Sequence, residues 1–435
     1  MKLSKIKKFR NYIILILIII FSPFIILESG SYLVNKAYDV LAGVNKHNNK
    51  VEIAEKNLIG EKADKIIRDF DKWKLVQPYA YDAFASYTNR EFSSETLNID
   101  AKGRRENGRP YDSSYYDNSI EIWAFGSSAL FGYPVNADDQ TITAQLEAIL
   151  NNNSEKKYKV INFAVPHYKI FNDIVLFNRL LAENKRPHAV ILFNGYNDTV
   201  SMFNDTLYES PITEKAFNIF FEMHIEKRVI YWELFYSNIL SFFNNTHLLT
   251  QRLAKALRVV AYKIDKKKFI DNIKNDRDIY FEKQKISVEK GKNRYLSHLE
   301  SFWQILDSRG ITVINAFQPG LLFTKKELTP EEEIIKNMYR KDYFALNDKE
   351  LNTLSIREVL IKNRGYDRKL LLETFYELNS KVLKIAENYS KINAIDLSKI
   401  IDNEKKSIFT DHIHLTPYGN KVIAQEIHKT IKNIY

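Results

Sequence analysis

The chain has no cysteine in its 435 residues, so it has neither a disulfide framework nor a thiolate metal site. It also lacks a nucleic-acid reader motif, and five basic residues among the first ten account for much of its net charge of +10. Its hydrophobic fraction of 45% and charged fraction of 27% exclude a disordered tail and a fibre. The sequence therefore predicts a globular protein without a nucleic-acid partner.

The longest apolar stretch lies near the N-terminus, where a basic leader at 1–10 precedes an almost uninterrupted run from Tyr12 to Leu27. This run is long enough to cross a bilayer, so we expect a transmembrane anchor at 11–28. The positive-inside rule places the N-terminus in the cytoplasm and the rest of the chain in the periplasm or outside the cell. The alternative is a signal peptide cleaved near Ser29-Gly30-Ser31, although the run is longer than a typical signal-peptide core.

A stalk and lead-in are predicted at 29–118, with one helix from Glu52 to Leu75. Five apolar runs then alternate with helical segments, at Ile120–Phe125, Lys159–Val165, Ala189–Phe193, Thr312–Phe317 and Asn393–Leu397. This alternation predicts an α/β fold with a parallel sheet covered on both faces. The chain between the third and fourth strands is too long for an ordinary crossover, so we expect a helical insertion at 203–295 between domain parts at 119–202 and 296–435.

Polar residues follow the predicted strands, at the edge where ligands gather in parallel sheets. In chain order they are Ser128, His167, Asn197, Asp198, Gln318, Asp411 and His414. Taken singly, the serine in AFGSSALFG could be a helix cap, the Asn-Asp pair a turn, and Gln318 with Pro319 the end of a strand. Their common location favours a catalytic site.

Three motifs occur in order after the expected strands: Gly126–Gly132 (GSSALFG), Gly195–Asp198 (GYND) and Asp411–His414 (DHIH). They resemble the sequence blocks of the SGNH, or GDSL-type, hydrolases, over residues 120–200 and from 296 to the C-terminus. The resemblance implies a flavodoxin-like three-layer αβα sandwich and a serine hydrolase that uses neither a metal nor another cofactor. The lead-in and the FQPG segment also resemble membrane-anchored bacterial relatives that act on cell-surface glycans.

The residues and the resemblance agree on the catalytic roles. Ser128 would be the nucleophile, His414 its general base and Asp411 the partner that fixes the imidazole tautomer. The oxyanion would be bound by the Ser128 N–H, the Asn197 side-chain amide and the His167 N–H. A metal cluster of Asp411, His412 and His414 is the alternative, but a typical zinc site needs a further ligand and supporting hydrogen bonds.

The first block and the second block each depart from the family pattern. Ser127 replaces the usual aspartate, whose main role is to support the turn. His167 stands where the second block normally has glycine, so a positive φ at this residue would be costly and its side chain would narrow the pocket.

We therefore predict a serine esterase that removes a small acyl group, above all O-acetyl, from an extracytoplasmic polysaccharide, with Gln318 lining the pocket. One alternative is a polysaccharide O-acetyltransferase that uses the same site, and another is a catalytically silent glycan-binding scaffold. The expected partners are an acylated cell-surface glycan and, through the N-terminal helix, the membrane.

The insertion is rich in basic residues, with fourteen Lys or Arg against six Asp or Glu from Arg252 to Arg294. One interpretation is a helical cap whose charges are simply solvated. The other is a basic face, including Lys266, Lys267 and Lys268, that holds an anionic polymer or lipid headgroups beside Ser128.

Overall fold

A computed structural model describes residues 44–134, 136–152, 154–183, 186–203, 266–343 and 368–432. The predicted leader and anchor, and residues 204–265 of the predicted insertion, lie outside these ranges. In the part of the chain that the structure describes, no helix is both long and apolar enough to cross a membrane.

The centre of the fold is a five-stranded parallel sheet, as predicted. Its strands are β5 (Ile120–Gly126), β6 (Tyr158–Asn162), β7 (Ala189–Asn194), β8 (Thr312–Phe317) and β9 (Ile392–Asp396). They lie in the order β6-β5-β7-β8-β9, which is the flavodoxin-like order. The second strand is shorter than predicted, since it ends at Asn162 instead of Val165. Beyond Asn162, the Phe163 and Val165 N–H groups still donate to β5.

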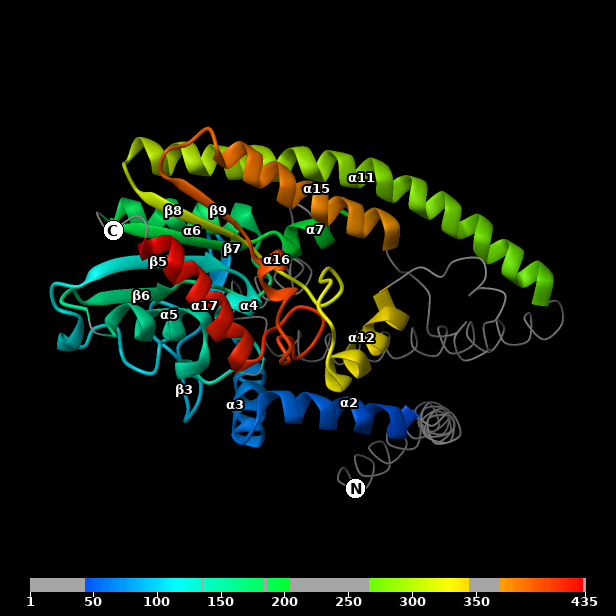
Figure 1. The fold of residues 1–435 in the computed structure, drawn as a ribbon, viewed down its shortest axis with the longest axis horizontal. Helices are drawn as coiled ribbons and strands as arrows, with labels where there is room; N and C mark the ends of the chain where they lie inside the picture. The colour runs from blue at the N-terminus through cyan, green and yellow to red at the C-terminus, as the bar shows by residue number, and fades with distance from the viewer. Residues whose placement is uncertain are drawn as a thin grey trace, which may run out of the picture.

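Helices cover both faces of the sheet, which gives three layers (Figure 1). One face carries α5 (Ile142–Asn151) and α17 (Pro417–Lys432), and the other carries α6 (Ile170–Ala182), α7 (Tyr196–Met202), α11 (Lys266–Ser308) and α15 (Arg368–Ala386). Three further helices are α4 (Ser128–Phe131), α12 (Pro330–Tyr343) and α16 (Leu397–Ile401), and 3-10 turns lie at Ser114–Tyr116 and Asp138–Gln140. In α11, Val288 and Tyr295 are fully buried in the core on this face of the sheet, so the C-terminal end of the predicted insertion belongs to a packed layer of the fold.

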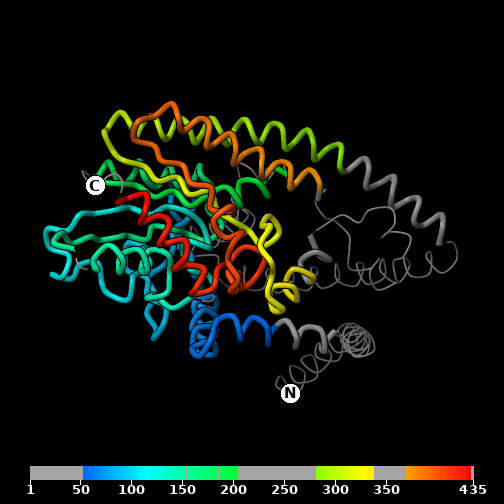
Figure 2. Tube along the Cα trace, viewed as in Figure 1, coloured from blue at the N-terminus to red at the C-terminus, as the bar shows by residue number. Residues whose placement is uncertain are grey.

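The lead-in folds into more elements than the sequence predicts. The single helix expected from Glu52 to Leu75 is wrong: α2 (Val44–Ile59) and α3 (Ala63–Leu75) are separate, because Gly60 between them adopts a φ of 91°. Two antiparallel pairs follow, β1 (Tyr79–Asp82) with β2 (Ser86–Asn89), and β3 (Phe92–Ser93) with β4 (Asn98–Ile99). In Figure 2 the lead-in helices, coloured blue, lie on the same side of the sheet as the red C-terminal helix, and both contribute to one apolar core.

Candidate active site

Ser128 is the first residue of α4 and directly follows the turn at the end of β5. The turn needs glycine at position 126, because a Cβ there would lie 2.5 Å from the Phe193 carbonyl oxygen of β7. Ser127 occupies the N-cap position but its side chain makes no capping hydrogen bond. The close approach of β5 and β7 thus places Ser128 at the carboxyl edge of the sheet.

Ser128, His414 and Asp411 form a hydrogen-bonded chain. The Ser128 Oγ lies 2.9 Å from His414 Nε2, and His414 Nδ1 lies 2.5 Å from Asp411 Oδ2. The other carboxylate oxygen of Asp411 accepts the backbone N–H groups of Ile413 (2.8 Å) and His414 (2.7 Å), which fixes the carboxylate in the loop. The Tyr133 ring packs edge-on against the imidazole at 5.5 Å. The side chains that were predicted to act together are therefore within hydrogen-bonding reach of one another.

The electrostatics of this loop keep Asp411 ionised. Burial opposes its charge, but the adjacent His414 and its hydrogen bonds, with a further contribution from His412, hold the pKa of Asp411 well below its usual range. Burial and the proximity of His414 lower the pKa of His412 to about 4, so His412 is neutral at pH 7. Its Nδ1 lies 3.9 Å from Asp411 Oδ1. Among the described residues, no group of three or more His, Asp and Glu side chains is arranged to hold a metal ion.

Two of the predicted oxyanion residues, His167 and Asn197, lie at a tight turn. A hydrogen bond of 3.1 Å from the Tyr168 N–H to the Val165 carbonyl closes this turn, with Pro166 second and His167 third. His167 has a φ of 71°, the positive value that the third position of a type II turn requires and that glycine usually provides. The Asn197 side chain, from the start of α7, donates to the Tyr168 carbonyl oxygen at 3.1 Å. Asn197 and the His167 turn are therefore adjacent.

Two buried carboxyl groups lie behind the oxyanion residues. Asp198 accepts the N–H groups of Ile170 (3.1 Å) and Gly195 (3.4 Å), and so joins the start of α6 to the start of α7. Burial raises the pKa of Asp198 to about 6, although these hydrogen bonds and the charge of Lys169 favour ionisation. Burial and the neighbouring Asp198 raise the pKa of Asp173 well above its ordinary value.

Gln318 is buried at the end of β8, with 1% of its surface exposed. Its backbone N–H donates to the Asn194 carbonyl oxygen of β7 at 2.8 Å. Within the described ranges, neither polar atom of its side chain has a hydrogen-bond partner. Its role in lining a pocket stays a prediction.

No protein-family model and no curated protein matches the chain. Several solved structures do. A lipolytic protein of the G-D-S-L family from Veillonella parvula matches at 12% identity and a TM-score of 0.33, over 72% of this chain and 99% of that one. A catalytic mutant of an acetylxylan esterase from Geobacillus stearothermophilus matches at 10% identity and a TM-score of 0.36, over 72% of this chain and 94% of that one. A lipase/acylhydrolase from Enterococcus faecalis matches at 12% identity and a TM-score of 0.32, over 72% of this chain and 95% of that one.

Because the identities and TM-scores are low, the chemistry of the site rests on its own geometry. The Ser128–His414–Asp411 chain has the geometry by which a serine hydrolase activates its nucleophile.

The lead-in supplies one side chain to this site that sequence reasoning missed. Arg105 is fully buried and donates to the carbonyl oxygens of Phe131 (2.7 Å) and Asn136 (2.5 Å), in the segment that follows Ser128. Its charge is balanced by Asp138 at 3.1 Å. Asn136 in turn donates to the carbonyl oxygen of Leu415, the residue after His414, at 3.1 Å. Arg105 therefore helps to hold the serine segment against the histidine loop.

Helix α2 brings a further carboxyl group close to the triad. Burial and the charge of Asp411 raise the pKa of Glu55 to about 7. No signal in the periodic sequence of α2 distinguishes Glu55 from the solvated glutamates around it.

Proposed function

We propose that the chain is a serine esterase that removes a small acyl group, O-acetyl in the first instance, from a polysaccharide outside the cytoplasm. The observation that carries this proposal is the Ser128 Oγ at 2.9 Å from His414 Nε2, with Asp411 on the opposite ring nitrogen. Ser128 Oγ adds to the ester carbonyl carbon while His414 takes its proton. The ester C–O bond then breaks, and His414 returns the proton to the leaving sugar hydroxyl.

A water molecule completes the reaction. His414 takes a proton from the water molecule while the water oxygen adds to the acyl carbon. The bond between the acyl carbon and Ser128 Oγ then breaks, and His414 returns the proton to Ser128 Oγ. In each step the Ser128 N–H, the Asn197 amide and the His167 N–H would stabilise the oxyanion. We expect the side chain of His167, in place of glycine, to narrow the acyl pocket and so to favour a small acyl group.

The location and the polymer rest on the sequence. The apolar run from Tyr12 to Leu27 supports a single membrane anchor with a cytoplasmic N-terminus. The resemblance to membrane-anchored relatives supports a cell-surface glycan as the substrate.

The test is labelling of the full-length chain with a fluorophosphonate, together with hydrolysis of an acetyl ester. We expect both activities in the wild type and neither in Ser128→Ala or His414→Ala. Asp411→Asn should lower kcat by about 10⁴, because the asparagine amide would hold the wrong imidazole tautomer. Absence of labelling in the wild type would overturn the proposal in favour of the silent scaffold. Labelling with turnover only after a sugar acceptor is added would favour the acetyltransferase.

A further inference from the structure

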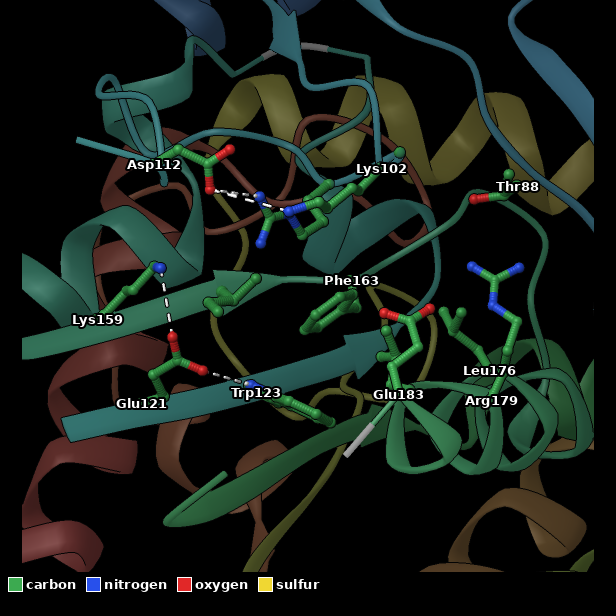
Figure 3. Close-up of a pocket in the computed structure, with 14 residues that line it drawn as sticks. Thr88, Lys102, Asp112, Glu121, Trp123, Lys159, Phe163, Leu176, Arg179 and Glu183 are labelled. Carbon is green, nitrogen blue, oxygen red and sulfur yellow. Dashed lines mark hydrogen bonds and ion pairs between the residues drawn. The ribbon is translucent and has the colours of Figure 1, made fainter. Parts of the chain in front are cut away.

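A cavity of about 250 Å³ lies away from the triad, on the face of the sheet that α6 covers (Figure 3). Its base is formed by β5, β6 and the residue that follows β6, its side by α6, and its rim by the lead-in loop at 102–112. This volume is below that of a pocket for a drug-sized ligand and suits a single small ring.

The base of the cavity is apolar. Trp123 and Phe163 lie there with ring centroids 5.4 Å apart, beside Ile161 and the α6 residues Leu176 and Leu180. In Figure 3 Phe163 lies between the polar rim and the side chains of α6. Phe163 is 7% exposed, so a small part of its surface is open to a ligand. Such a base suits the C–H face of a ligand rather than a charged group.

The cations that line the cavity are paired with carboxylates. Its basic residues are Lys102, Arg104, Lys159 and Arg179, and its acidic residues are Asp112, Glu121 and Glu183. Asp112 pairs with Lys102 (4.0 Å) and Arg104 (3.6 Å), and Lys159 pairs with Glu121 (3.3 Å). Arg179 pairs with Asp82 outside the cavity. Because every cation has a carboxylate partner, the cavity does not suit a phosphate or sulfate group, which needs uncompensated cations.

An apolar base under a rim of hydrogen-bond donors and acceptors matches the chemistry of a neutral sugar ring, which has C–H faces and a girdle of hydroxyl groups. We propose that this cavity is a subsite for one neutral sugar residue of a glycan. The assignment rests on the proposed function, because it deepens the choice of a polysaccharide as the substrate. Thr88, which lines the cavity, is the neighbour of Tyr87 in β2, and Tyr87 donates to the Pro166 carbonyl oxygen at 2.9 Å. Strand β2 thus connects the subsite to the His167 turn.

The experiment measures binding by calorimetry, independently of hydrolysis, in the full-length chain carrying Ser128→Ala. The probes are xylotetraose, chitotetraose and inorganic phosphate. The test variant adds Lys102→Ala and Asp112→Ala, whose side chains are 56% and 78% exposed and so leave the core intact. The matched control adds Lys285→Ala and Glu282→Ala, an ion pair on α11 with side chains 52% and 68% exposed.

We expect at least one tetrasaccharide to bind with an affinity that hardly changes with salt, and to bind about tenfold more weakly in the test variant only. Phosphate binding in place of sugar binding, no binding of either tetrasaccharide, or equal weakening in the control would each overturn the subsite. Failure of the esterase proposal is recognised separately, because the fluorophosphonate experiment uses the chain with Ser128 intact.

Discussion

Arg104 and Arg105 are consecutive in the chain, yet their guanidinium groups serve different regions of the molecule. Arg104 reaches Asp112 at 3.6 Å and lines the cavity over the sheet. Arg105 is 0% exposed and donates to Phe131 and Asn136 behind the nucleophile. One short stretch of the lead-in therefore contributes to the proposed sugar subsite and to the support of the triad.

Replacement of Arg105 by methionine should impair both stability and catalysis. The change removes the donors to Phe131 and Asn136 and leaves Asp138 buried without its cation. We expect a loss of about 3 kcal/mol in the free energy of unfolding, measured in urea. We also expect slower fluorophosphonate labelling of the protein that remains folded.

The control for Arg105→Met is Lys292→Met. Lys292 is also a buried cation, paired with Glu289 and Glu377 at 2.6 Å on α11 and α15, away from the serine segment. This variant should lose stability while its folded fraction is labelled at the wild-type rate. If Arg105→Met were labelled as fast as Lys292→Met, Arg105 would have only a structural role.

Asn197→Ala tests the oxyanion assignment. Loss of one preorganised donor typically lowers kcat by about 10²–10³ and affects KM much less, because the interaction strengthens in the transition state. Hydrolysis of a small acetyl ester gives both constants. Asn178→Ala is the matched control, since Asn178 lies on the exposed side of α6 and its side-chain amide donates to the Ile174 carbonyl oxygen within its own helix. Equal kcat values for the two variants would exclude Asn197 from the oxyanion site.

The sheet and the triad could be predicted because their signals are local. Each strand is an apolar run, and the carboxyl end of each run places the next polar residues at one edge of the sheet. The expectation that a positive φ at His167 would be costly came instead from the family resemblance, because the second block normally has glycine there; the structure shows a φ of 71°. The second strand ends at Asn162, three residues before the turn from Val165 to Tyr168, although its apolar run continues to Val165.

The role of Arg105 could not be predicted in this way. In the segment GRRENGR it is one of three arginines, and nothing in the local pattern marks it as buried. Its partners, Phe131, Asn136 and Asp138, are supplied by a segment some distance along the chain, and their carbonyl and carboxylate groups acquire their directions only when the nucleophile loop folds. Burial of a charge depends on such tertiary partners rather than on periodicity.

Asp198 should give the stability a measurable pH dependence. Its pKa is about 6 in the folded chain, against about 4 in an unfolded one. Between these values the folded chain retains a proton that the unfolded chain has lost, so the stabilising contribution declines as the pH rises, by up to about 3 kcal/mol. The pKa of Asp411 is shifted in the opposite direction, below its usual range. Its contribution to the free energy of unfolding is therefore lost only at lower pH, as the pH falls through its folded pKa.

Urea unfolding at several pH values from about 4 to 7 measures this decline. In Asp198→Asn the side chain is neutral throughout, so the slope of stability against pH should be smaller, whatever the absolute stability. Asp71→Asn is the control, because Asp71 is an exposed aspartate on α3 and should retain the wild-type slope. A wild-type slope in Asp198→Asn would show that Asp198 does not contribute to the pH dependence of stability in this range.

His167→Gly should affect backbone strain and acyl selectivity together. A φ of 71° is unfavourable for a residue with a Cβ, so glycine should raise the free energy of unfolding by about 1 kcal/mol. Removal of the imidazole should also widen the space beside Ser128. We therefore expect the ratio of kcat/KM for a butyryl ester to that for an acetyl ester to rise by about tenfold.

The control for this variant is Ser86→Gly. Ser86 has a similar φ of 75° but lies at the start of β2, outside the catalytic residues. Urea unfolding should show a comparable gain in stability for Ser86→Gly. The same pair of esters should show that this variant keeps the acetyl preference of the wild type. If His167→Gly gained stability and kept the acetyl preference, the imidazole would not limit the acyl pocket. If it lost activity on both esters, the histidine side chain itself would be needed in the reaction.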